Sequence, residues 1–191
     1  MGSANMILFG LVTIYRKTYS SGAAEPVVSN VLTTSTFTQL GYQSEDGLTE
    51  TLEFEHVDIN VPEANGTVES VLVNESATIS VALQERQLSE MVHSMPGATY
   101  TAGAVDGTNE NELTVGGKAA ADSCDALLFV GEDRGGIQKA IYYPKVIKQG
   151  PGGLQYSKRG ISLVTYNWKA LIDLTRDAGE RLRMEWEITE A

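Results

Sequence analysis

The chain has very few of the residues from which catalytic and metal sites are built. Cys124 is the only cysteine, so no disulfide can form within one chain. The two histidines, His56 and His93, have no cysteine or histidine at zinc-ligand spacing. The best phosphate-loop candidate, Gly116–Lys118, is followed by Ala119 where Ser or Thr is required. No nucleophile lies in a recognisable motif with a base, so the sequence predicts no enzyme, metal site or cofactor.

Basic residues are scarce in the first half of the chain. Residues 1–100 hold 12 acids and 3 bases, whereas residues 101–191 hold 13 acids and 11 bases. Nucleic-acid binding depends on neutralising phosphates with Lys and Arg, so specific DNA or RNA binding is not expected. Long hydrophobic runs are also missing: the apolar segment Met6–Val12 is too short to span a bilayer, and no membrane association is predicted.

The most distinctive feature that is present is acidic sheet-forming sequence between Leu40 and Met95. This stretch contains eleven Asp and Glu residues and one base, Arg86. The apolar content of the whole chain is ordinary, which argues against wholesale disorder. At 191 residues the chain is most simply a single domain. A concentration of acid on strands, without catalytic residues, favours an assembly surface over a reaction cleft.

The first half of the chain is predicted to contain an arm, a loop and a hairpin. Residues 1–15 form an N-terminal strand or arm, and residues 16–51, rich in Ser, Thr and Gly, form a long loop. Residues 52–73 form a hairpin that turns at Asn65-Gly66, because both residues accept positive φ. A further strand is expected at residues 78–83, where apolar and polar residues alternate.

The second half begins with the one helix that the pattern supports, at residues 84–95. Its apolar stripe has helical spacing, and Pro96-Gly97 ends it. The residues predicted to pack from this helix onto a sheet are Leu88, Met91, Val92 and Met95. Residues 97–124 are predicted to be irregular and residues 125–191 to form a second set of strands. The apolar run Ala126–Val130 is typical of a strand buried on both faces, and residues 161–174 and 181–188 alternate as half-buried strands do. The resulting fold class is mainly β: two packed antiparallel sheets, as a sandwich or barrel, flanked by one helix.

The hairpin changes its pattern partway along the first strand. Glu53 and Glu55 share one face, while Leu52 and Phe54 take the other. After Glu55 the apolar residues move to the acidic face. A bulge, or a strand that passes from one environment into another, would produce this change. An ordinary solvated strand face is the competing interpretation of the acids.

The order of these elements resembles the tail tube (major tail) proteins of long-tailed bacteriophages, which are related to type VI secretion tubes. The resemblance depends on a Gly- and Thr-rich loop, an acidic hairpin, a following strand and a short helix. It is best over residues 5–96 and rests on strand pattern alone over residues 125–190, while residues 97–124 depart from it. The segments that carry it are Leu40-Gly41, Asp46-Gly47, Glu75–Glu85 and Leu88.

The resemblance implies hexameric rings stacked into a hollow tube in the virion tail, assembled in the bacterial host cytoplasm. Its implied partners are further copies of the chain, a tape measure protein in the lumen, and terminator and baseplate or tail-tip proteins at the ends. Genomic DNA would pass through without specific binding. The residues expected to face the lumen are Glu50, Glu53, Glu55, Asp58 and Glu69. Those expected in a loop between rings are Leu40, Gly41, Tyr42, Glu45, Asp46 and Gly47.

Two other functions remain open on the sequence. Another β-rich virion protein, such as a tail terminator, head-tail connector or decoration protein, would form a single ring or surface trimers and no polymer. A carbohydrate-binding β-sandwich would need exposed aromatic residues on one face. Trp168 and Trp186 instead lie on apolar strand faces.

Overall fold

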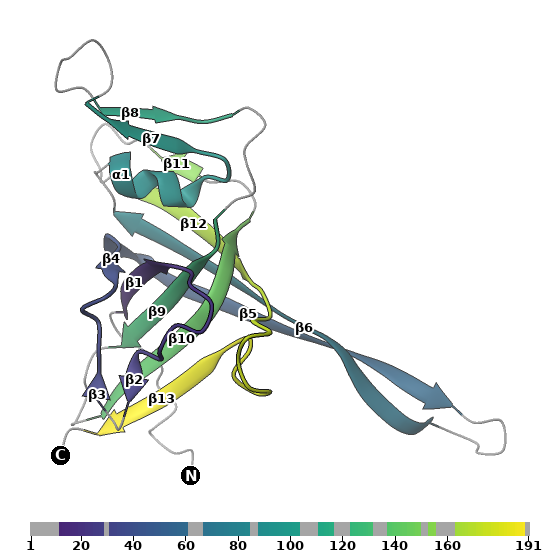
Figure 1. The fold of residues 1–191 in the computed structure, drawn as a ribbon. Coiled ribbons are helices and arrows are strands. Elements are labelled where there is room, and N and C mark those ends of the chain that lie inside the picture. The colour runs from purple at the N-terminus through teal and green to yellow at the C-terminus, as the bar shows by residue number, and fades with distance from the viewer. Residues whose placement is uncertain are drawn as a thin grey trace.

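A computed structural model describes residues 12–28, 31–60, 67–84, 88–103, 111–116, 123–131, 137–149, 153–155 and 163–189. The predicted fold class is confirmed: the protein is mainly antiparallel β, with a helix and an extended hairpin (Figure 1). The strands of the main sheet are β1 (Val12–Thr18), β4 (Thr38–Gln39), β5 (Tyr42–Asn60), β6 (Thr67–Gln84), β9 (Asp125–Gly131), β10 (Ile137–Lys148), β11 (Gly153–Gln155), β12 (Leu163–Ala170) and β13 (Met184–Thr189).

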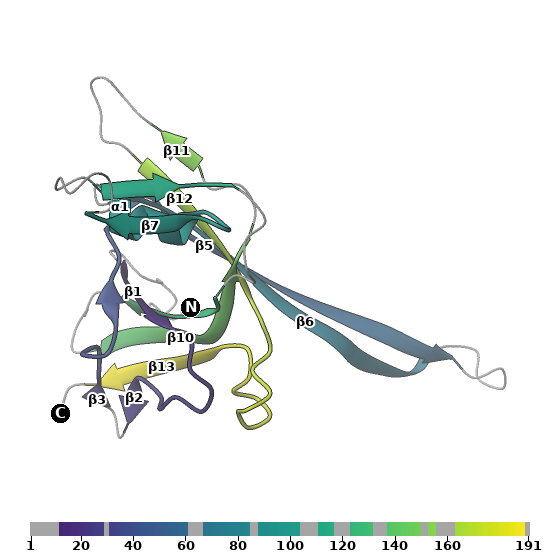
Figure 2. The same ribbon diagram turned by 45° about the horizontal axis from the view of Figure 1, so that its top comes forward.

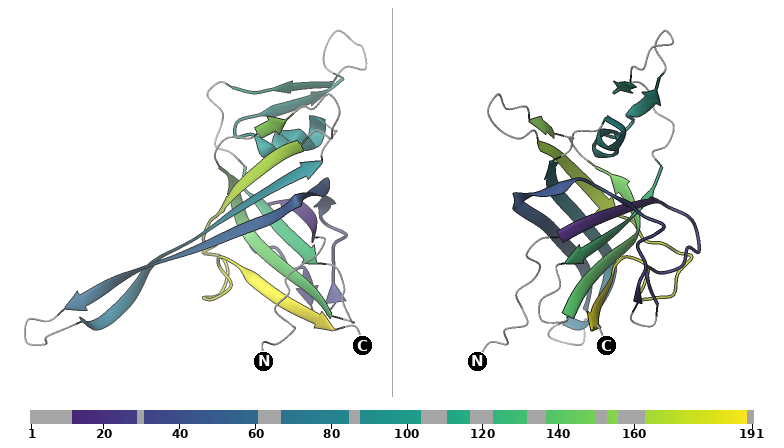
Figure 3. Two further views of the ribbon diagram at one scale, coloured as in Figure 1. Left: turned by 180° about the vertical axis from the view of Figure 1, so that it is seen from behind. Right: turned by 90° about the vertical axis from the view of Figure 1, so that its left-hand side faces the viewer.

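The two predicted layers are halves of one continuous sheet. Its order is β4-β1-β9-β10-β12-β6-β5, with β13 on β10 and β11 on β12. β10 joins the halves, because residues up to Val146 pair with β9 or β13, whereas Val146–Lys148 pair with β12. The sheet curls around this strand (Figure 3), and buried residues of β1 and β9 pack in one cluster with those of β6 and β12.

Strand periodicity explains where the core lies. Every second residue of β12 is buried, which places Tyr166 and Trp168 inside, with their rings stacked at 5.3 Å. All seven residues of β9 are buried, as its unbroken apolar run predicted. Phe129 joins the main core, while Leu128 on the opposite face joins a second cluster with Tyr142. Together these strands form the body from which the hairpin projects.

The helical segment is shorter than predicted. α1 (Leu88–Met91) continues as a 3-10 turn, η2 (Val92–Ser94), and residues 85–87 lie outside the described part. Met91 and Met95 are buried as expected, and Val92 is half-buried. Leu88, which begins α1, is 37% exposed and is the least buried of the four residues predicted to pack. The helix lies at one end of the body beside β7 and β8 (Figure 2).

Two predicted loops contain strands. Within residues 16–51, β1 continues to Thr18 and β5 begins at Tyr42, and β2 (Val27–Val28), β3 (Val31–Leu32) and β4 lie between them. Within residues 97–124, β7 (Thr99–Ala102) pairs with β8 (Asn111–Thr114). These strands span two to four residues, too few for alternation to be recognised in the sequence. Of the predicted N-terminal strand, residues 1–11 lie outside the described part.

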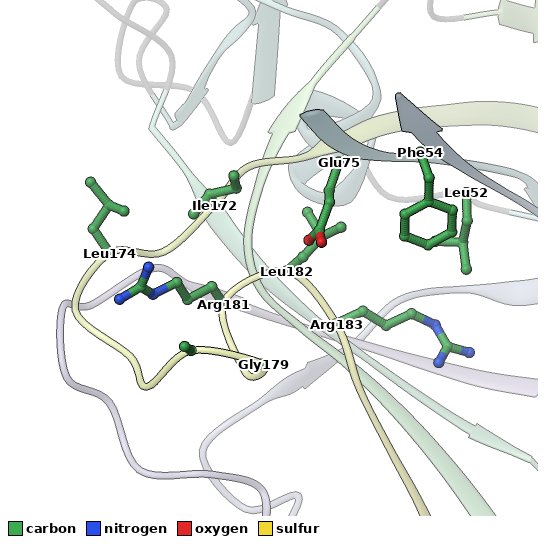
Figure 4. Close-up of a pocket in the computed structure, with 10 residues that line it drawn as sticks. Leu52, Phe54, Glu75, Ile172, Leu174, Gly179, Arg181, Leu182 and Arg183 are labelled. Atoms are coloured by element: carbon green, nitrogen blue, oxygen red, sulfur yellow. The ribbon is translucent and has the colours of Figure 1, made fainter. Parts of the chain in front are cut away.

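The prediction of one alternating strand over residues 161–174 is partly wrong. The alternation of residues 161–174 holds only to Ala170, where β12 ends. Ile172 is 44% exposed and Leu174 76% exposed. Leu171 N–H still donates to Lys145 O of β10, and beyond it Asp173 N–H donates to Arg181 O, which closes the loop of residues 171–183. This loop comes to lie beneath the base of the hairpin (Figure 4).

Candidate functional site

The hairpin is longer than predicted and projects from the body as a two-stranded ribbon (Figures 1 and 3). The strands expected at residues 67–73 and 78–83 are a single strand, β6. β12 pairs only with Ala77–Gln84 of β6, so the outer part has one partner, β5, among the described residues. We call Glu53–Asn60 with Thr67–Ser76 the arm. Its predicted turn, Asn65-Gly66, lies outside the described residues.

Large apolar side chains of the arm are exposed to solvent. The most exposed is Phe54, at 55%, followed by Val73 at 53% and Val57 at 50%. The others are Ile59, Val71 and Leu72. A two-stranded ribbon is marginally stable by itself, and clustered exposed apolar side chains commonly mark interaction surfaces. The arm therefore has the composition of a surface that becomes covered by another chain.

The apolar residues of the arm change face near a bulge in β6. Glu55 pairs with Asn74 but His56 pairs with Leu72, so Val73 is extra, at the position where the sequence pattern slips. Between the body and the bulge, apolar residues lie on the face that continues the core. Beyond it Leu72 stays on that face, but the other apolar residues lie on the opposite one. The inner apolar patch is Leu52, Phe54 and Leu72, and the outer apolar patch is Val57, Ile59 and Val71.

Four of the five acids predicted to face a lumen are exposed on the arm. Glu53, Glu55 and Glu69 share the face opposite the core, and Ser76 Oγ donates to Glu53 Oε2 at 3.3 Å. Asp58 lies on the other face by strand alternation. Neither β5 nor β6 contains Lys or Arg. The arm thus has a purely acidic set of charges on both faces, and which face meets a lumen stays a prediction.

Glu50 is a correction to the predicted set of lumen acids, because it points to the body. It accepts from Arg183 Nε at 2.6 Å and Nη2 at 3.4 Å, and the Tyr143 hydroxyl also donates to it. Arg183 Nη1 in turn donates to Glu185 at 2.8 Å. Glu50 lies on the core face opposite Ile79, so its carboxylate is 78% covered and requires a cation. This ion pair holds the base of β5 against the loop that precedes β13.

Sequence reasoning missed this anchor. The alternation of residues 181–188 places Arg183 on a polar strand face, and in the sequence Tyr143 is only one residue of a β-rich segment. A signal was available in the charge pattern, because residues 125–191 hold ten of the fourteen Lys and Arg residues while β5 has none. The pairing of one particular acid with one particular base depends on the fold, since Glu50 and Arg183 are 133 residues apart.

A second polar cluster fixes the loop of residues 171–183. Asp173 is buried, and its Oδ1 accepts from Tyr19 Oη at 3.0 Å and from Thr175 Oγ1 at 2.7 Å. Burial acts to raise the pKa of Asp173, but these hydrogen bonds and Arg176 lower it. Arg176 also donates to Ala23 O at 2.8 Å and lies over the Tyr142 ring. The loop is therefore held in a definite position beside the arm.

An apolar groove lies between the base of the arm and this loop (Figure 4). Its volume is about 520 Å³. Leu52 and Phe54 form one wall, and the loop forms the other. The remaining lining residues are Glu75, Ile172, Leu174, Ala178, Gly179, Arg181, Leu182 and Arg183. A volume in this range is typical of sites that bury a ligand or several side chains.

The predicted inter-ring loop is divided between core and strand. Leu40 is fully buried, and its N–H donates to Ile14 O at 2.8 Å, so it is a core residue and cannot contact another ring. Gly41 is half-buried. Tyr42, Glu45, Asp46 and Gly47 belong to β5, where Gln43 pairs with Leu83 and Leu48 with Val81. Residues 44–47 therefore bulge from the edge strand, and Gly47 has a φ of 79° there.

His93 lies off the apolar stripe of the helical segment and is expected at the surface or an interface, but it is half-buried near two cations. Its pKa is lowered to about 3, first by burial and then by Arg16 and Lys148. Arg16 is paired with Asp125 at 2.9 Å, and burial raises the pKa of Asp125 although Arg16 opposes this. Within the described part of the chain, no three His, Cys, Asp or Glu residues are grouped as metal ligands. Nor does that part contain a helix that is long and apolar enough to cross a membrane.

Comparison with known proteins identifies no family for this chain. A scan against protein-family models found no match, and a search of curated proteins found no significant match. The function of the protein is therefore inferred from the arm, its anchor and the groove.

Proposed function

We propose that the protein is a self-assembling tail tube subunit, whose arms join those of neighbouring copies into the wall of a hollow tube. The observation that carries this proposal is the arm itself. It has exposed apolar residues on both faces and unpaired strand edges along its outer half in the described chain. An exposed edge with apolar side chains is an aggregation hazard unless it pairs, and closure of neighbouring hairpins into a barrel covers every edge.

The charge of the arm supports a tube that carries DNA. Carboxylates such as Glu53 and Glu55 repel phosphates, so DNA would slide along the wall without sticking. At physiological salt the Debye length is about 8 Å, so only acids near the bore act on the DNA. In this proposal the rings are hexameric, a tape measure protein occupies the lumen before DNA does, and terminator and tail-tip proteins close the two ends.

Negative-stain microscopy of the purified protein tests the proposal. We expect rings or tubes at high protein concentration, since assembly by a repeated contact is driven by mass action. Protein that remains monomeric at high concentration, even with its tail partners added, would contradict it. Single rings without stacking would instead favour a terminator or head-tail connector, and trimers would favour a decoration protein.

A carbohydrate-binding function has less support. Sugar sites of β-sandwiches need aromatic rings that are open to solvent, but Trp168 is fully buried and Trp186 is half-buried against Tyr142. Phe54, the one aromatic residue among the described residues of the arm, lines the groove. A glycan-binding screen is the direct test of this alternative.

A further inference from the structure

The groove and the outer apolar patch are complementary surfaces on one chain. The groove has apolar walls, with Glu75, Arg181 and Arg183 at its polar positions (Figure 4). Arg183 is already paired with Glu50 and Glu185. Arg181 donates from Nε to Arg176 O at 3.1 Å, but it has no ion pair with any described residue. The groove thus offers apolar area together with one cation that lacks a carboxylate partner.

The outer apolar patch presents what such a groove would bind. Val57 and Val71 are directly opposite each other across the ribbon, and Ile59 is opposite Glu69 on the same face. All four side chains are exposed. Burying aliphatic side chains of this size removes apolar surface from water and so stabilises an interface. A carboxylate at the edge of an apolar patch matches an unpaired guanidinium at the edge of an apolar groove.

The groove cannot be filled by the arm of its own chain. Phe54 lines the groove, and Ile59 lies five residues farther along the same extended strand. Five strand residues span about 17 Å, so the outer patch points away from its own groove. Any arm that enters the groove therefore comes from another copy.

We propose that the groove of each subunit receives the outer apolar patch of a second copy, with Glu69 of the incoming arm beside Arg181 and so no longer among the acids that face the lumen. This inference rests on the proposed self-assembly and names the contact that drives it. Because Leu52 and Phe54 lie on the opposite face of β5 from Val57 and Ile59, a subunit presents its outer patch on one side and its groove on the other. Such a contact is head-to-tail, and it generates closed rings or filaments instead of two-fold dimers.

Crosslinking between two different single-cysteine variants tests the contact. Both carry Cys124→Ser; one adds Ile59→Cys and the other adds Leu174→Cys. After the two proteins are mixed and assembled, a short bis-maleimide can join only cysteines that meet at an interface. We expect a dimer band from the mixture that is at least several-fold stronger than from either variant alone.

The matched control pairs Ile59→Cys with Val31→Cys. Val31 is 62% exposed and lies in β3, away from the arm and the groove (Figure 1). This pair should give only background crosslinking. If rings or tubes form but Leu174→Cys crosslinks no better than Val31→Cys, the groove inference is overturned and the proposed function stands. If the mixture stays monomeric and no pair crosslinks, both are overturned.

Discussion

At the scale of single residues, His93 is the most perturbed titratable group that the structure describes. It sits in η2 with Nδ1 buried and without a hydrogen-bond partner among the described residues. Arg16 of β1 and Lys148 of β10 face it, and Asp125 of β9 partners Arg16. The Lys148 ammonium also donates to Val92 O at 3.2 Å, which keeps that charge close to the ring. Protonation of His93 would add a further positive charge beside Arg16 and Lys148, which is unfavourable, so the imidazole remains neutral at pH 7.

This placement predicts a loss of stability in mild acid. The unfolded chain binds a proton at His93 below a pKa of about 6.5, whereas the folded chain does so only near about 3. The contribution of the neutral ring is complete above pH 6.5 and is lost as the pH falls towards 3. Between pH 7 and pH 4 the native protein should lose about 1–2 kcal/mol more unfolding free energy than the His93→Gln variant.

Urea unfolding at the two pH values measures this difference. His56→Gln is the matched control for the histidine-to-glutamine change, because His56 is exposed on the arm. Equal pH dependence in native protein and His93→Gln would show that the ring gains its proton without cost in the folded state.

At the scale of elements, the arm is a long hairpin that is attached to the body at its base. The Glu50–Arg183 pair and the Tyr143 hydroxyl connect β5 to the loop before β13 and to β10. Beyond Glu53 the arm has only its own ladder and the groove contacts among the described residues. The direction in which the arm leaves the body is therefore decided by a few side chains at one end. The same side chains set the shape of the groove.

Removing the charge of Glu50 should weaken this anchor. Glu50→Gln leaves Arg183 with only Glu185 as a carboxylate partner in the described chain, and it should lower the unfolding free energy by about 1–3 kcal/mol. Glu53→Gln, three residues away on the opposite face and exposed, should change it by less than about 0.5 kcal/mol. Chemical denaturation of both variants compares them; similar losses would mean that Glu50 anchors nothing.

At the scale of the whole molecule, acid and base are separated in space as well as in sequence. The arm has no base, whereas Arg176, Arg181 and Arg183 gather in the loop beneath its base and before β13. A subunit with this polarity attracts the arm of one copy to the loop of another. Apolar contact and charge therefore favour the same head-to-tail arrangement.

A charge on the outer patch should block assembly without unfolding the subunit. Ile59→Asp places a carboxylate where an apolar contact is expected, yet in the free subunit this position is 46% exposed. We expect a native melting temperature within about 2 °C together with loss of rings or tubes. Sedimentation velocity and a thermal melt measure both properties. Val31→Asp is the exposed control and should assemble normally; assembly by Ile59→Asp would exclude the outer patch from the contact.

The lumen assignment has its own test. Reversing Glu53 and Glu55 to Lys leaves both side chains on the exposed face of β5, so tubes should still form. Phosphates would then be attracted to the wall, and DNA ejection from particles that carry the variant should slow. Normal ejection rates would show that these acids do not line the bore.

The sequence by itself determined the β class, the alternating core strands and the absence of familiar catalytic motifs. Alternation in β12 and the apolar run of β9 are local patterns of seven or eight residues, and they specify burial because strand geometry fixes which side each residue faces. The pattern slip after Glu55 was also visible, and the bulge at Val73 is its structural counterpart.

Only the tertiary structure decided what the arm's base contacts and where the groove lies. In the sequence Glu50 is an acid like its neighbours, and only the fold brings it to Arg183, which is 133 residues away. Leu174 continues the apolar alternation in the sequence, but in the structure the chain leaves the sheet after Leu171. The acidic stretch of the sequence is thus divided in two by the fold. Glu50 belongs to the body, and the exposed acids from Glu53 onward belong to the arm. The physical reason is that ion pairing and burial depend on distance in space, which strand periodicity does not encode.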